Sequence, residues 1–259
     1  MKIKNLSSAF LLLSSFGAFA QTNTYSKLEI KKNEVFKVGP TNMLLVDTLI
    51  MHDKATIQFS PEVKGILQSN VAYVGNNCTV TSRGLNGINY TSKTMGTPGQ
   101  DGGSLDIILH FERLGKLTID TRGGRGGDGM KGKDGAKGAP DRIEERSVVG
   151  PDGKYTTVRV VIPAQLGSDG TSATTGFTGG NGGDVQLSYS TNDFIPVFNN
   201  AEAKNGILLL TTAGAYGRDG QPGRGGLGRM DGKLVQLENE KPQDGKVELV
   251  NVNSLSVQE

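Results

Sequence analysis

Glycine recurs at every third position in several stretches of the chain, and this period limits the fold more than any other feature. Residues 123–140 read as six successive Gly-x-y triplets, and residues 167–184, 214–225 and both ends of 84–104 keep the same spacing. Glycine lets backbones approach closely, and the polyproline II helix has three residues per turn and no internal hydrogen bonds. The N–H and C=O groups of such stretches must therefore find partners on other segments.

Two other conformations compete with a packed bundle of these tracts. A collagen triple helix has the same period, but it needs long uninterrupted runs rich in proline. Here the longest run contains only Pro140. Mobile loops are the second alternative, because ordering glycine has a high entropic cost. A strict period in several tracts favours the packed bundle over both alternatives.

Short apolar-alternating runs separate the tracts and predict β-strands. Three outgoing runs, 78–82, 117–121 and 208–212, align so that Leu117 matches Leu208, and each leads directly into a glycine tract. Return runs align at 105–109 and 185–189, with a looser third copy at 232–237. The repeating unit is therefore a strand out, a glycine-rich excursion and a strand back.

Such a unit cannot bury its apolar face alone, whereas stacked units bury one continuous core. The sequence thus predicts an all-β fold, a parallel β-helix (solenoid) with glycine-rich polyproline II excursions packed on one face. An antiparallel β-sandwich with long loops is the alternative. Residues 21–259 are expected to form a single domain. Within it we expect an N-terminal cap at 21–40, glycine-rich excursions at 84–103, 123–183 and 214–232, and a β-hairpin at 142–162 inserted into the second excursion.

The triplet tracts resemble two kinds of known sequence. They are collagen-like in period over about 70 residues. They are also similar, at the level of the motif, to the glycine-rich polyproline II bundles of some phage tail-fibre-tip adhesins and of a glycine-rich antifreeze protein. The second resemblance implies backbone-to-backbone packing of extended segments and display of a binding surface.

The N-terminus has the pattern of a secretory signal peptide at residues 1–20. Lys2 and Lys4 precede an apolar stretch, and Ala18-Phe19-Ala20 forms an A-x-A cleavage site. We therefore expect export through the general secretory route to the extracellular space, cell surface or periplasm. Removal of the signal leaves 26 of the 28 basic residues against 26 acidic residues. This balance argues against a nucleic-acid partner, and no apolar run is long enough for a transmembrane span.

Reactive groups are sparse. Cys78 is the only cysteine, so no internal disulfide can form, and it aligns with core leucines. No cofactor or metal site is expected, although the local pattern around Asp128 matches a calcium-binding nonapeptide that works only in tandem copies. The alternative of a polysaccharide lyase or hydrolase would need paired carboxylates. Asp106, Asp120 and Asp184 are its candidates.

These observations predict an exported, non-enzymatic structural or adhesive protein that displays a glycine-rich surface. Its expected partners are a cell-surface glycan or protein, or further copies of itself, and a self-assembling envelope subunit is the second alternative. Apolar side chains that interrupt the tracts are the predicted binding residues, because aromatic groups on a rigid polar surface make good contact anchors. They are Tyr90, Met95, Phe177, Tyr216 and Met230.

Overall fold

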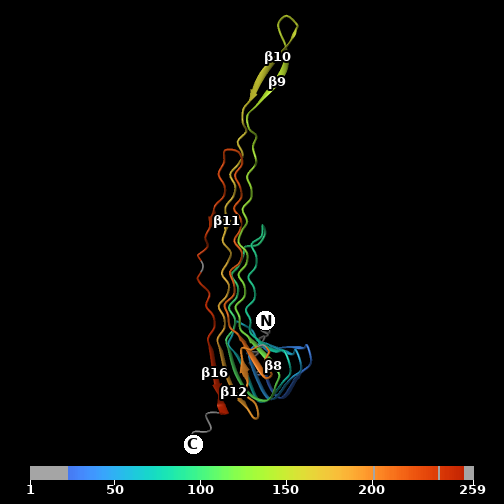
Figure 1. Ribbon diagram of the computed structural model, residues 1–259, viewed down its shortest axis with the longest axis vertical. Coiled ribbons are helices and arrows are strands. Elements are labelled where there is room, and N and C mark those ends of the chain that lie inside the picture. Colours follow the sequence, from blue (N-terminus) through green and yellow to red (C-terminus); the bar gives the residue numbers. More distant parts are fainter. Residues whose placement is uncertain (1–22, 201, 239, 254–259) are drawn as a thin grey trace, which may run out of the picture.

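The computed structural model describes residues 23–253 apart from 201 and 239, and its regular structure is β-strand (Figure 1). Figure 1 separates two regions, a broad base and a long bundle of extended chain that rises from it. The predicted signal peptide, residues 1–20, lies outside the described residues. Within the described ranges, no helix is long and apolar enough to cross a membrane.

The base contains two parallel sheets of six strands each. The first sheet runs, from edge to edge, through β1 (Asn23–Ile30), β3 (Met43–Met51), β5 (Gly65–Val74), β7 (Leu105–Leu114), β12 (Val185–Thr191) and β16 (Val247–Asn251). The second sheet runs through β2 (Val35–Lys37), β4 (Thr56–Gln58), β6 (Cys78–Thr81), β8 (Lys116–Asp120), β14 (Gly206–Leu210) and β13 (Val197–Phe198).

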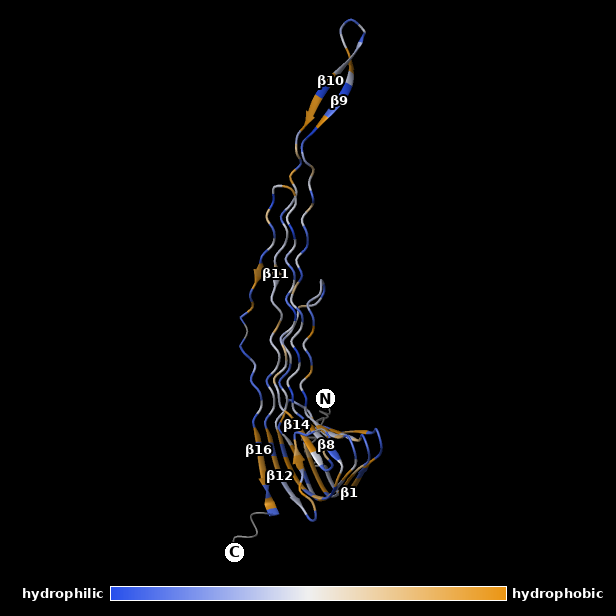
Figure 2. Cartoon of the chain, viewed as in Figure 1, coloured by the Kyte–Doolittle hydropathy of each residue, from blue (hydrophilic) through white to orange (hydrophobic). Residues whose placement is uncertain are grey.

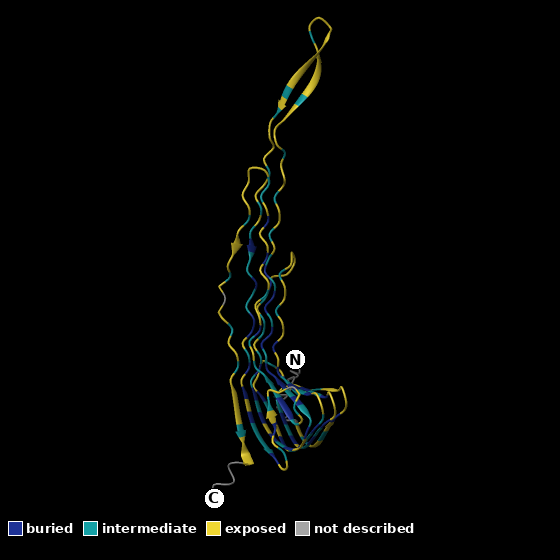
Figure 3. Cartoon of the chain, viewed as in Figure 1, coloured by how far each residue is buried: buried dark blue, intermediate teal, exposed yellow. Residues whose placement is uncertain are grey.

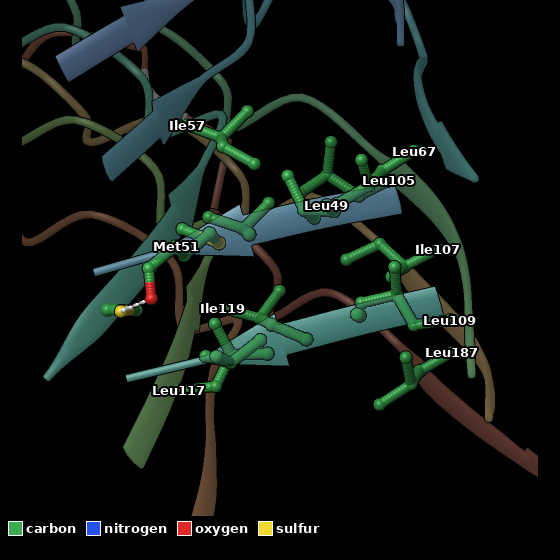
Figure 4. Close-up of a cluster of buried hydrophobic side chains, with 14 of the residues drawn as sticks. Leu49, Met51, Ile57, Leu67, Leu105, Ile107, Leu109, Leu117, Ile119 and Leu187 are labelled. Atoms are coloured by element: carbon green, nitrogen blue, oxygen red, sulfur yellow. Dashed lines mark hydrogen bonds between the residues drawn. The ribbon is translucent and has the colours of Figure 1, made fainter. Parts of the chain in front are cut away.

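Apolar side chains from both sheets form one core between them (Figure 4). Alternation along each strand places one set of side chains inward, as in β7, where Leu105, Ile107 and Leu109 are buried. Ile57 and Ile119 of the second sheet are also fully buried. Apolar residues are concentrated in this base (Figure 2). Burial of the shared core supplies the main hydrophobic stabilisation of the sheets.

The predicted parallel β-helix is wrong, because the strands form two large six-stranded sheets and not a closed solenoid. The chain alternates between the sheets from β1 to β6, but β6 is separated from β7 by a long excursion, residues 82–104, in place of a short corner. The repeat indicated parallel stacking, but it carried no information on closure. The described part of the segment expected to cap the fold, 21–40, contains β1 and β2, the edge strands of the two sheets. Tyr25 and Phe36 of these strands pack edge-on with ring centroids 6.1 Å apart.

The register of the second sheet differs from the sequence alignment by one residue. Leu117 pairs with Ile207, not with Leu208. Ile207 is therefore the fully buried apolar residue of β14, and Leu208 pairs with Thr118, on the opposite face of the strand. A shift of one residue moves every side chain of a strand to the other face.

Three excursions leave the base and together form the bundle, in which six extended segments lie side by side (Figure 1). We number them in chain order as segments 1 (84–90), 2 (96–104), 3 (121–139), 4 (165–184), 5 (211–226) and 6 (230–246). Segments 4 and 6 also contain the short parallel pair β11 (Ala173–Thr174) and β15 (Leu234–Val235). The first excursion turns back about halfway along the bundle (Figure 1).

The second excursion extends beyond the bundle as an antiparallel hairpin. It consists of β9 (Arg142–Val149) and β10 (Tyr155–Ile162), paired from Arg142–Ile162 to Val149–Tyr155. An isolated bridge between Ala139 and Gln165 joins the hairpin to the bundle. The residues for which the sequence predicted an inserted hairpin thus lie at the end of the molecule farthest from the sheets (Figure 1).

Candidate binding surface

The bundle is held together by backbone hydrogen bonds that repeat every third residue. Segment 3 donates to segment 5, segment 5 to segment 4, and segment 4 back to segment 3. Gly126 N donates to Ala215 O, Gly217 N to Phe177 O, and Phe177 N to Gly127 O, each at 2.9 Å. Segments 1, 2 and 3 form a second cycle of the same kind. An extended segment cannot satisfy its own backbone N–H and C=O groups as a helix does, so these contacts between segments satisfy them.

The number of glycines in a triplet follows the number of neighbouring segments. Where segments 1 and 2 are present, segment 3 has two glycines per triplet, Gly123-Gly124 and Gly126-Gly127. A methyl group on Gly126 would overlap the Phe177 carbonyl oxygen of segment 4, and one on Gly127 would overlap the Ile88 carbonyl oxygen of segment 1. Side chains are thus excluded on two sides.

Beyond the first excursion, segment 3 has one glycine per triplet, and side chains replace the missing neighbours. Met130, Lys133 and Ala136 take the second positions there. Their N–H groups donate to hydroxyl oxygens of segment 4, at 2.8 Å for Met130 to Thr174 and 2.6 Å for Lys133 to Thr171. The outer half of the bundle is accordingly narrower and more exposed than the inner half (Figure 3).

Polar groups join the bundle to the sheets. Asp120 ends β8, and its carboxylate accepts hydrogen bonds from Arg122 Nε at 2.9 Å and Nη2 at 2.7 Å. Burial raises the pKa of Asp120, but the hydrogen bonds and charge of Arg122 outweigh burial, so the pKa lies below its ordinary value. Thr121 is fully buried and donates its hydroxyl to Gly183 O at 2.7 Å. These contacts set the direction in which segment 3 leaves the sheet.

The five predicted binding residues lie at separate places along the bundle. Tyr90, at the end of segment 1, lines an open groove of about 810 Å³ together with Met130 and Lys131 of segment 3. Met95, in the turn between segments 1 and 2, is 77% exposed. Phe177 is half-buried, and its ring lies so close to Gly96 that a methyl group there would overlap it. Phe177 therefore packs inside the bundle.

Tyr216 and Met230 belong to the third excursion. Tyr216 is 45% exposed, and its hydroxyl lies 3.4 Å from the Glu240 carbonyl oxygen, to which it donates. Met230, which begins segment 6, is 73% exposed. The five residues thus come from three excursions, and they contact different neighbours. The described geometry does not bring them together in one site.

Further exposed apolar side chains lie on the hairpin, which was predicted as an element but not included among the binding residues. Ile143, Val149, Tyr155 and Val161 are each 60–79% exposed. Cross-strand pairing places Ile143 beside Val161 and Val149 beside Tyr155 on the same face. The two apolar pairs lie at opposite ends of the hairpin, and Glu145 and Arg159 lie between them on the same face. The sequence predicted the hairpin, but its position beyond the bundle could not be obtained from the sequence.

Charged side chains of the hairpin are paired with one another. Glu144 contacts both Arg142, at 2.8 Å, and Arg146, at 3.0 Å, and Glu145 contacts Arg159 at 3.1 Å. The nearby positive charges and hydrogen bonds, above all from Arg146, lower the pKa of Glu144. Because these charges are paired within the hairpin, its surface has little net electrostatic potential of either sign. What it presents to a partner is mainly apolar side chains and strand edges.

The carboxylates considered for an enzyme have separate partners. Asp120 pairs with Arg122, and Asp106 pairs with Lys64 at 2.6 Å. Asp184 accepts a hydrogen bond from Lys246 N at 2.7 Å. These contacts are structural, because each carboxylate stabilises a strand end or a bundle segment.

Asp128, the residue considered for calcium, also serves the bundle. Its Oδ1 accepts hydrogen bonds from Arg218 N at 2.9 Å and from Arg125 Nη2 at 2.6 Å. The backbone hydrogen bond from Arg218 is the main cause that lowers the pKa of Asp128. Its carboxylate therefore links segments 3 and 5.

The candidate binding surface thus has two parts, the polar sides of the glycine bundle and the hairpin beyond it. Both depend on the second excursion, which supplies segments 3 and 4 and the hairpin.

No protein-family model matches the chain, and neither the curated proteins nor the solved structures include a significantly similar one.

Proposed function

We propose that this protein is an exported, non-enzymatic adhesive protein in which the glycine bundle acts as a stalk that presents the β9–β10 hairpin. The observation that carries the proposal is the position of four large apolar side chains, each at least 60% exposed, beyond the end of the bundle. Large apolar side chains exposed at both ends of one short hairpin are suited to contact with a partner. The secretory signal pattern at residues 1–20 supports export.

The construction of the bundle supports a role as a stalk. Its segments are linked along their length by backbone hydrogen bonds between segments far apart in the sequence. A structure of this kind holds the hairpin away from the sheets without needing a thick apolar core. The engagement of Asp106, Asp120 and Asp184 in structural contacts favours adhesion over the enzymatic alternative.

A bead-binding experiment tests this proposal. Beads coated with the mature chain, residues 21–259, are expected to bind cell envelopes, and a variant in which 143–161 is replaced by a short Gly-Ser turn is expected to lose that binding. The matched control carries Tyr216→Ser and Met230→Ser, which remove exposed apolar groups from the sides of the bundle. Equal binding by the hairpin-deleted and intact chains would contradict the proposed role of the hairpin.

A further inference from the structure

The two edges of the hairpin differ in their protection against pairing with another strand. A strand in a two-stranded hairpin leaves half of its backbone N–H and C=O groups unpaired, and natural proteins guard such edges with charged residues. β9 contains four charged residues, Arg142, Glu144, Glu145 and Arg146. β10, with the sequence YTTVRVVI, contains only Arg159. The β10 edge is therefore the unguarded one.

The β10 edge is not only unguarded; its amino-acid composition also favours pairing with another strand. Seven of its eight residues are β-branched or aromatic, the types with the highest β-propensity. The strand has no proline and one charge, which are the properties of segments that pair with a further strand. The hairpin has only two strands, and an isolated two-stranded hairpin is at best marginally stable in water. An additional strand on the β10 edge would stabilise it.

We propose that β10 pairs antiparallel with β10 of a second copy, so that two hairpins form a four-stranded sheet in the order β9-β10-β10-β9. This inference rests on the proposed function, because it identifies the partner of the exposed hairpin as another copy of the same chain. The argument for this occupant is the self-complementarity of β10. A two-fold axis through Val158 places this residue opposite Val158 of the second copy. The same axis places Tyr155 opposite the second copy's Val161.

The remaining pairs of this register are also compatible. Thr156 lies opposite Val160, and Thr157 lies opposite Arg159, so like charges do not face each other. Tyr155 and Val161, which are 79% and 64% exposed in the single chain, become cross-strand neighbours. Aromatic and β-branched pairs of this type stabilise antiparallel sheets. The same register on β9, centred on Glu145 or Arg146, would place two like charges in direct contact.

The internal neutralisation of the hairpin supports a like partner. The ion pairs of Glu144 and Glu145 with Arg142, Arg146 and Arg159 leave little net charge to repel a second copy. Since antiparallel pairing of the tips directs the two bundles away from each other, the bulky sheets do not collide. The dimer would join two molecules through their hairpins and would have roughly twice the length of one.

Analytical ultracentrifugation of the mature chain with charge-swap variants tests the pairing. We expect a concentration-dependent dimer for the wild-type chain, and mainly monomer for Val158→Glu and for Val158→Lys, because each places two like charges opposite each other at the two-fold axis. An equimolar mixture of the two variants is expected to recover the dimer, which also shows that the variant hairpins fold. Ser147→Glu, on the β9 edge, is the control and should dimerise like the wild type.

A wild-type chain that stays monomeric at every concentration, or Val158 variants that dimerise as it does, would overturn this inference. The proposed function fails in a different way. If the chain is monomeric but deletion of the hairpin still abolishes envelope binding, adhesion stands and the partner is not a second copy. If the chain dimerises through Val158 but the hairpin deletion leaves envelope binding intact, self-pairing stands and the adhesive role of the hairpin is lost.

Discussion

Ile107 in the sheets and Gly127 in the bundle are both buried, yet they exclude water in opposite ways. Ile107 fills the space between two sheets with an apolar side chain, and its backbone pairs within the first sheet. Gly127 has no side chain, and the space is filled by the carbonyl groups of neighbouring segments. The base is thus stabilised by side-chain burial and the bundle by close backbone contact.

The comparison explains the composition of the chain. A stalk built from backbone contacts needs glycine where neighbours are present and polar residues elsewhere, so it adds length with few apolar residues. The cost is the entropy of ordering glycine, which is larger than that of any other residue. Apolar residues are accordingly concentrated in the sheets, and again at the hairpin, where the bundle contacts end (Figure 2).

The largest effect is expected from removing a large side chain from the core. Phe111 in β7 is fully buried, so Phe111→Ala should lower the free energy of unfolding by about 3–5 kcal/mol. Ile108→Ala in the same strand is the matched control, because Ile108 is 45% exposed on the outer face. Urea denaturation measures both. A similar loss for the two variants would show that the space between the sheets does not carry the stability.

Much of the base could be predicted from particular residues, and the errors have physical causes. The runs at 105–109 and 185–189 lie within β7 and β12. The looser copy at 232–237 was wrong, because those residues lie in segment 6, and the first sheet is instead completed by β16. Residues 232–237 and 245–250 have the same alternation after a glycine, so local pattern could not distinguish them. The neighbouring segments decide which one joins the sheet.

The bundle was predictable in its contacts and not in its dimensions. The glycine period was sufficient to predict that extended segments exchange backbone hydrogen bonds. In segment 3, the triplets change from two glycines to one at Gly129, and this change marks the point where the first excursion ends. The meaning of the change is clear only once the neighbouring segments are known. The exposure of the apolar residues in the tracts could not be predicted: Phe177 is half-buried with its ring against Gly96, whereas Met95 is 77% exposed.

A smaller effect, about 1–3 kcal/mol, is expected from a methyl group placed in the bundle. Gly127→Ala introduces a Cβ that overlaps the Ile88 carbonyl oxygen, and backbone cannot move aside as a flexible side chain can. Lys133→Ala is the control, because it occupies the same position of a one-glycine triplet and is exposed. Hydrogen exchange should show faster exchange of bundle amides only for Gly127→Ala. Unchanged protection would mean that close backbone contact is not what orders the bundle.

The junction of the two regions gives the smallest of these effects and the only pH-dependent one. The folded-state pKa of Asp120 is lowered from its ordinary value of 3.8. The unfolded chain therefore binds a proton at higher pH than the folded chain does. The stability that Asp120 contributes is fully present above pH 3.8 and is lost as the pH falls through the lower folded-state pKa.

Asp120→Asn should remove this contribution. The side chain of Asp120 is only 11% exposed and pairs with Arg122, so we expect a loss of about 1–2 kcal/mol at pH 7. The difference between wild type and variant should shrink as the pH is lowered below 3.8, since the wild-type carboxylate then becomes neutral as well. Urea denaturation across this pH range measures the change.

The control is Asp106→Asn, whose surface pair with Lys64 should contribute about 0–1 kcal/mol. A difference for Asp120→Asn that stays constant in acid would mean that its effect comes from altered hydrogen-bond geometry at the junction, and not from the charge that joins sheet and bundle.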